Sequence, residues 1–393
     1  MKSYLYRVSF LLGIGFLPFL GFRLFSYPIS DWFFLSSFIL ALLGNTNKKY
    51  NIKELIPNYV YFSFILIGVG GVLSSILSSN SLDSLLSTFK LLFIGFGIFF
   101  TLIYNLIDGL KPKIIIYTLI VGVGIFAVFT IFDFYKIYAL TRGLNIRSIG
   151  LSDHITNAAG VLGIGLCSAL AIFQSTKQRI LPIFLIGTIG LALIFTGSVS
   201  GLLSVTIAIL LSKNTKSSFN FKGKILSLTF FLVAVYFIQR YEIYDVIGRI
   251  QSATSGRYNT LNTRELNITA GIHGIFSSVA IFFFGTGLGG ETGFVLDSTG
   301  GFFQVHNSLI QAWYQGGILT VIGIFIVWVR PILQSGDSSK FSANQAFQMS
   351  ATCAVIFGMT SPIMNQRYIW IPILCLIASK ICEWEKLSVP ISE

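Results

Sequence analysis

Long apolar runs, separated by short basic links, make up most of this chain. A helix rises 1.5 Å per residue, so about 20 apolar residues are enough to cross the hydrocarbon core of a bilayer. Only 11% of the 393 residues are charged, whereas soluble domains carry about 25%. Lipid is therefore the solvent for most of the chain, and each run must satisfy its backbone hydrogen bonds within a helix.

We predict an all-α polytopic membrane protein with about 12 transmembrane helices. It is expected to form one integral membrane domain, with nine spans in residues 1–238, a large outer loop in 239–306 and three spans in 307–393. The predicted spans are 5–22, 27–43, 58–79, 85–107, 114–135, 157–174, 180–197, 200–212, 224–238, 307–329, 344–361 and 366–381.

The basic links predict the orientation of these spans. Most of the 27 Lys and Arg residues fall in links on one side if the chain begins in the cytoplasm, as the positive-inside rule requires. Both termini are then cytoplasmic. The cations that depart from the rule are Arg23, Lys90, Lys136, Arg142, Arg147, Arg240, Arg249, Arg257, Arg264 and Arg367.

Cations on the outer side or within a span indicate an anionic ligand there, because topology and desolvation both disfavour them. Pairing with Glu242, with Asp245 or with lipid head groups is the alternative for any single one. All three histidines, His154, His273 and His306, also fall on the outer side. The net charge of +12 is thus explained by membrane topology, and we expect no nucleic-acid partner.

The outer loop 239–306 is too long for a simple connector. From Arg264 onward, apolar residues recur at helical spacing through 268–279, which predicts an amphipathic helix at the outer interface with its apolar side against lipid or the bundle. The sequence GTGLGG at 285–290 has GxGxxG spacing, but no strand precedes it, so a dinucleotide site is not indicated. These glycines suit a sugar-binding loop or a plain linker.

Several motifs along the chain resemble those of the O-antigen ligase and polymerase family of bacterial membrane glycosyltransferases. The motifs are HNS at 306–308 with Gln311 and Gly316-Gly317, NTREL at 262–266, FGTGLG at 284–289, DHITNAA at 153–159 and TGSVSG at 196–201. Val199 occupies a position where that family usually has an arginine.

The resemblance implies a glycan donor carried on undecaprenyl diphosphate and an acceptor hydroxyl on lipid A core or on a second lipid-linked glycan. The reaction would take place at the periplasmic face of the bacterial inner membrane, and the lipid bilayer would surround the spans of the chain. Ligase and polymerase differ only in the acceptor, and the sequence does not separate them.

The carboxylates favour metal-independent catalysis without a cofactor. No D-x-D motif lies on the outer side, and the close acidic pair Glu383 and Glu385 is predicted to be cytoplasmic. Arginine suits the role of the metal, because its planar fork binds phosphate oxygens in pairs and keeps its charge. Arg264, which lies in a family motif on the outer side, is the expected catalytic diphosphate contact. Arg257 and Arg147 are further substrate contacts by position, and Asn307 by motif.

His306 is the expected catalytic residue that accepts or positions the proton of the acceptor hydroxyl, because an imidazole titrates near neutral pH. The alternative is that it caps or packs the start of a helix. Lys90, at the outer part of the fourth span, either faces a cavity, where it would supply the charge missing at Val199, or extends to the head groups. His154 and His273 are interpreted as structural.

A transporter or flippase of the same lipid-linked glycan is the alternative function. About 12 spans and cations in the membrane would fit it equally well. A transporter should carry polar residues through the midplane, whereas the polar motifs here gather on one face.

Overall fold

The computed structural model describes residues 2–44, 55–141, 148–175, 180–212, 229, 236, 260–289, 294–296, 302–334 and 342–388. About 81% of them are helical. The helices are α1 (Lys2–Gly15), α2 (Ile29–Gly44), α4 (Asn58–Leu77), α5 (Ser81–Leu92), the π-helical turn η1 (Phe93–Gly97), α6 (Ile98–Ile107), α7 (Pro112–Thr141), α8 (Ile155–Ser175), α9 (Ile180–Phe195), α10 (Val199–Leu211), α13 (Thr260–Phe276), α14 (Val279–Phe284), α15 (Ser308–Leu333), α16 (Ser342–Gly358) and α17 (Arg367–Ser388). Two antiparallel hairpins pair β1 (Arg23–Leu24) with β2 (Tyr27–Pro28), and β3 (Phe294–Leu296) with β4 (Phe302–Gln304).

The protein is an α-helical membrane protein, as predicted. Within the described residues, five helical stretches are long and apolar enough to cross a bilayer: Asn58–Leu77, Ser81–Ile107, Pro112–Ile137, Ile155–Phe173 and Ser308–Leu333. The helices Ile29–Leu43, Ile180–Phe195 and Val199–Leu211 are apolar but shorter. Every predicted span overlaps a helix except 224–238, most of which lies outside the described residues. The total of 12 spans and their orientation stay predictions.

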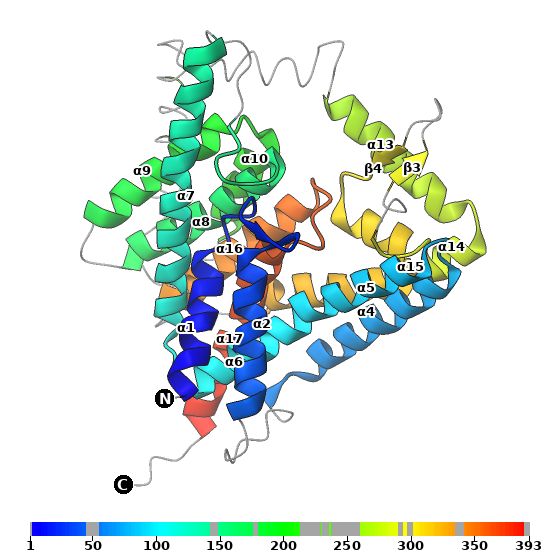
Figure 1. The fold of residues 1–393 in the computed structure, drawn as a ribbon, viewed down its shortest axis with the longest axis horizontal. Helices are drawn as coiled ribbons and strands as arrows, with labels where there is room; N and C mark the ends of the chain where they lie inside the picture. The colour runs from blue at the N-terminus through cyan, green and yellow to red at the C-terminus, as the bar shows by residue number, and fades with distance from the viewer. Residues whose placement is uncertain are drawn as a thin grey trace.

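Close helix packing depends on small residues where two backbones meet. A Cβ added at Gly70 of α4 would lie 2.9 Å from the Thr320 backbone nitrogen of α15. Conversely, a Cβ added at Gly323 of α15 would lie 2.6 Å from the Ser63 carbonyl oxygen of α4. Figure 1 shows α4, α5 and α15 running side by side. Small residues permit this approach, which compensates for the weak apolar driving force between helices in lipid.

The bundle has two distinguishable ends. At the end that carries both termini, which we call the termini end, Arg7 of α1 forms a 2.6 Å ion pair with Asp108 after α6 (Figure 1). At the other end, which we call the hairpin end, Arg23 of β1 forms a 2.7 Å ion pair with Asp153 before α8. Arg367 at the start of α17 pairs with Asp31 at the start of α2. The starts of α2, α8 and α17 therefore lie together at the hairpin end.

Part of the predicted outer loop is helical. Of residues 239–306, the structure describes 260–289, 294–296 and 302–306. The predicted amphipathic helix corresponds to α13, which buries Asn267, Gly271 and Ile275. A Cβ added at Gly271 would lie 3.1 Å from the Ile310 side chain of α15, so this side of α13 faces the bundle. Leu266 stays 69% exposed, so apolar surface also remains on the outside of the helix.

The glycine-rich segment 285–289 packs into a kink of α15. Gly317 interrupts that helix with φ +74° and ψ −178°, which removes the helical partners of the preceding carbonyls. The backbone N–H groups of Thr286 and Gly287 donate to the carbonyls of Tyr314 and Gln315 at 3.0 and 2.8 Å. The glycines of segment 285–289 therefore let its backbone approach that of α15. These hydrogen bonds hold the end of α14 against α15.

Candidate functional site

Arg264 connects two motifs that are far apart in the sequence. From α13 its Nη1 donates to the Ser200 hydroxyl at 2.5 Å. Ser200 lies in the first turn of α10, where the Ser198 side chain accepts from the Gly201 N–H at 3.2 Å. The start of a helix already carries partial positive charge. A guanidinium held at that point makes the position attractive to an anion.

The expected catalytic residue His306 interacts electrostatically with Arg264. His306 is half-buried just before α15. Burial lowers the pKa of His306, and the positive charge of Arg264 and the interaction with His154 lower it further. The imidazole is therefore neutral at physiological pH and is able to accept a proton.

His154 joins the site through the turn that opens α8. Its Nδ1 accepts from the Thr156 N–H at 3.1 Å, which leaves Nε2 as the protonated nitrogen of the neutral ring. This bond fits the structural interpretation made from the sequence. His154 also interacts electrostatically with His306, the candidate base.

Asp153 holds the turn before α8 in place. Its Oδ2 accepts from Arg23 at 2.7 Å and its Oδ1 from the Asn157 amide at 2.8 Å. Burial alone would raise the pKa of Asp153, but the hydrogen bonds from Asn157 and Arg23 outweigh it and hold the pKa below its usual value. Asn157 in turn accepts from the Tyr368 hydroxyl at 2.8 Å. The start of α17 is thereby fixed against α8.

Arg367 is the most deeply buried cation of this region. The residue is 2% exposed, and its Nη2 donates to Asp31 Oδ2 at 2.6 Å. Its Nη1 is buried and has no hydrogen-bond partner among the described residues. An unpartnered donor on a buried guanidinium is costly, so this nitrogen is suited to receive an oxygen from a ligand.

Lys90 lies with the Arg367 group. Its Nζ lies 5.7 Å from the centre of the Tyr27 ring, and its charge interacts with Asp31, Arg367 and Arg23. The side chain is exposed. Both interpretations made from the sequence, a cavity position and extension to the head groups, fit these contacts. Arg264 contacts the side chain of Ser200, which is the residue next to Val199.

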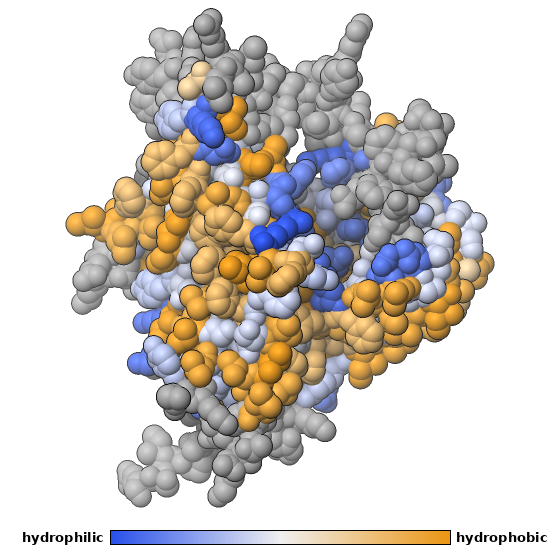
Figure 2. Space-filling model, in the orientation of Figure 1, coloured by the Kyte–Doolittle hydropathy of each residue, from blue (hydrophilic) through white to orange (hydrophobic). Residues whose placement is uncertain are grey.

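Together these groups form a cluster at the hairpin end that we call the basic site. Its four cations exceed its two carboxylates, so the site has a surplus of two positive charges when both histidines are neutral. Figure 2 shows hydrophilic residues in a hollow between the side that carries α8 and α10 and the side that carries α13, bordered by apolar surface. The members are Arg23, Asp31, Lys90, Asp153, His154, Arg264, His306 and Arg367.

Asn307 has a structural role in the described contacts. Its Oδ1 accepts from the backbone N–H groups of Leu309 and Ile310 at 2.9 and 3.1 Å, which caps α15. Its Nδ2 donates to the Met359 carbonyl at 3.0 Å. Next to it, the Ser308 hydroxyl donates to the Ser361 carbonyl at 2.7 Å. The HNS motif therefore holds the loop that leads to Arg367, and the predicted substrate contact by Asn307 stays untested.

Two of the predicted substrate contacts, Arg147 and Arg257, lie outside the described residues. The sequence reasoning did not select Arg23, Arg367 or Asp153 for the site. Arg23 and Arg367 gave a signal, since both departed from the positive-inside pattern. Their ion pairs with residues more than 100 positions away could be found only in the folded chain.

No protein-family model matches the chain, and no curated protein matches it. Its function is therefore argued from the basic site and the sequence motifs. Within the described residues, no three His, Cys, Asp or Glu side chains converge as metal ligands.

Proposed function

We propose that the chain is a membrane glycosyltransferase of the O-antigen ligase and polymerase type. It transfers a glycan from undecaprenyl diphosphate to an acceptor hydroxyl in the assembly of a surface polysaccharide. The observation that carries the proposal is the placement of the Arg264 guanidinium on Ser200, with a neutral His306 within its electrostatic reach. The hairpin end faces the periplasm in this proposal, and the chain crosses the inner membrane about 12 times.

The reaction needs two groups that the basic site supplies. The acceptor oxygen attacks the anomeric carbon, the bond from that carbon to the phosphate oxygen breaks, and the lipid diphosphate leaves with the electron pair. Arg264 stabilises the negative charge on the leaving diphosphate. The neutral imidazole of His306 takes the proton of the acceptor hydroxyl.

The remaining charges bind and position the donor. Arg23 and Arg367 are each held by one carboxylate, so their guanidinium groups are fixed before the substrate arrives. Fixed cations stabilise developing charge without reorganising during the reaction. The surplus positive charge of the site is matched by the negative charge of a diphosphate.

Transport of the same lipid is the competing proposal. The charged residues of the basic site gather at one end of the bundle, which favours chemistry at one membrane face. A transporter should place its binding site near the midplane, reachable from both sides.

The proposal is tested with purified protein and lipid-linked oligosaccharide, with and without lipid A core. Longer lipid-linked chains identify a polymerase, and glycan on the core identifies a ligase. Arg264→Met should abolish product and His306→Ala should slow its formation by about 10²–10⁴, while both variants fold as the wild type does. Absence of any product with the wild-type protein, together with movement of the lipid between leaflets of proteoliposomes, would instead establish transport.

A further inference from the structure

A cavity lies at the opposite end of α15 from the basic site. Its volume is about 1110 Å³, and it is lined by residues of α4, α15 and α17 and by the segment before α4. The residues of α15 that line the cavity, Phe325 to Leu333, lie in the last part of that helix, beyond the kink at Gly317. Most of the length of α15 therefore separates the cavity from His306, which lies just before the start of the helix.

Two cations gather at one end of this cavity. The Arg330 guanidinium lies over the Tyr59 ring, 4.5 Å from its centre. Lys380 of α17 donates from Nζ to the Pro331 carbonyl at 2.9 Å, in the last turn of α15. The C-terminal end of a helix carries partial negative charge, so cations are stable there. Among the described residues that line the cavity, Arg330 and Lys380 are the charged ones.

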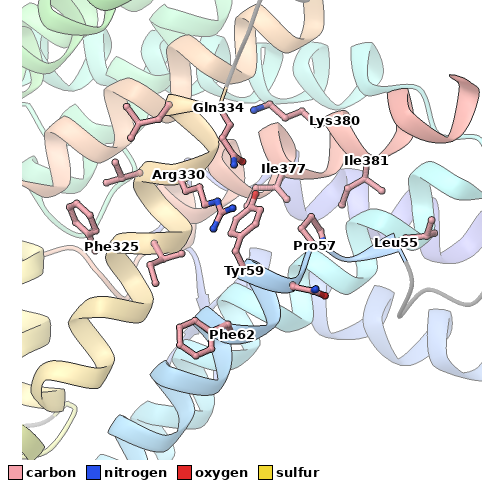
Figure 3. A pocket seen from close by; sticks show the side chains of 14 residues that line it. Leu55, Pro57, Tyr59, Phe62, Phe325, Arg330, Gln334, Ile377, Lys380 and Ile381 are labelled. Atoms are coloured by element: carbon pink, nitrogen blue, oxygen red, sulfur yellow. The ribbon is translucent and has the colours of Figure 1, made fainter. Parts of the chain in front are cut away.

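The other end of the cavity is apolar. Figure 3 shows Phe62 and Phe325 on α4 and α15, away from Arg330, Gln334 and Lys380. Phe62 and Phe325 lie nearer the middle of their helices, whereas Arg330 and Gln334 lie at the end of α15. Phe62 and Phe325 are 54% and 49% exposed, so the apolar walls open to the surroundings of the bundle. In a helix bundle that spans a bilayer, those surroundings are acyl chains.

We propose that this cavity binds one anionic glycerophospholipid. Its phosphate contacts Arg330 and Lys380, and its acyl chains lie against Phe62 and Phe325. The order of groups along α4 and α15, cationic near the helix ends and apolar toward the middle, is the order of a lipid from head group to tail. Basic pockets between transmembrane helices bind anionic head groups in this way. A soluble anion would gain nothing from the open apolar walls.

The proposal is tested on the full chain by titration with phosphatidylglycerol and with phosphatidylcholine of the same acyl chains, followed by native mass spectrometry. We expect one phosphatidylglycerol to bind saturably and more tightly than phosphatidylcholine. Arg330→Gln should weaken phosphatidylglycerol binding by about fivefold, the effect of one cation near a lipid head group. Lys111→Gln, which removes a charge from the termini end outside the cavity, should leave binding unchanged.

Any of four results would overturn the proposal. The first three are equal affinity for the two lipids, unchanged affinity in Arg330→Gln, and displacement of the lipid by glycerol 3-phosphate at similar concentration, which would identify a soluble anion site. The fourth is a dimer without bound lipid, which would assign the cavity to a second copy of the chain. Circular dichroism and thermal unfolding of each variant establish that a change in affinity does not come from a loss of fold.

Discussion

Asn307 offers the sharpest separation between a structural and a catalytic role at the start of α15. The substitution Asn307→Ala removes the cap formed by its Oδ1 with Leu309 and Ile310 and the bond from its Nδ2 to the Met359 carbonyl. Loss of a cap costs about 1 kcal/mol. A carbonyl left without its partner costs about 1–3 kcal/mol, and the lower part of that range applies because this bond is only partly buried. We expect the free energy of unfolding to fall by about 2–3 kcal/mol.

The effect should be local before it is global. Release of the Met359 carbonyl loosens the loop 359–366, which leads directly into Arg367. Hydrogen exchange measured by mass spectrometry should therefore rise in peptides from 307–312 and from 359–366. It should stay unchanged in the first two turns of α1, which lie at the termini end with Arg7.

Asn307→Asp is the matched control. A carboxylate keeps the cap on Leu309 and Ile310, and its charge suits a helix start, but it cannot donate to Met359. Exchange should therefore rise in 359–366 and stay low in 307–312. If Asn307→Ala abolishes glycan transfer while unfolding and exchange stay at wild-type values, the capping argument is refuted and Asn307 contacts the substrate.

Three further substitutions test the basic site and its support. His306→Ala should slow transfer by about 10²–10⁴, the usual effect of losing a general base. Because burial and neighbouring cations lower the pKa of His306 from 6.5, the wild-type pH–rate profile should stay level as pH falls through 6.5 and decline only below the lowered pKa; a decline that begins above 6.5 would contradict this role. Ser200→Ala removes the oxygen that accepts from Arg264 and should raise the donor KM by about tenfold or more in initial-rate assays, whereas an equal effect of Ser212→Ala, at the far end of α10, would count against it. Gly317→Ala places a Cβ 2.2 Å from the Phe283 carbonyl oxygen at a positive φ, so thermal unfolding should show a lower Tm, and an unchanged Tm would mean that the kink is not required.

The positions of the helices could be predicted because an apolar run long enough to cross a bilayer must be helical there. The residues at which the helices end could not be predicted in this way. The first apolar run continues to Phe22, but α1 ends at Gly15, and the chain then turns through Pro18 into the β1–β2 hairpin. The π-helical turn at Phe93–Gly97 also has no periodic signal. It is supported by packing, since a Cβ added at Gly95 would lie 2.3 Å from the Phe64 ring.

The candidate site was predictable in part for a similar reason. Arg264 and His306 could be chosen because a motif and a topological side agree for each of them. Ser200 could not be chosen as the partner of Arg264, because the TGSVSG motif contains three hydroxyl residues, Thr196, Ser198 and Ser200, and the sequence does not indicate which of them contacts Arg264. The glycine-rich segment at 285–289 was ambiguous for the opposite reason. Its pattern fits a ligand-binding loop or a linker. In the structure, the glycines let the backbone of this segment hydrogen-bond to the backbone of α15 at the Gly317 kink.

The charges of the basic site are not equally compensated, and the difference argues for an external anion. Arg23 and Arg367 each have a carboxylate partner. Arg264 has only the neutral hydroxyl of Ser200 among the described residues, and burial lowers the pKa of its guanidinium. A half-buried cation bonded to a neutral group destabilises the fold relative to an apolar side chain of similar size. A ligand that supplies the missing negative charge would offset this cost. A diphosphate bound between Arg264 and the neutral imidazole of His306 would supply that charge.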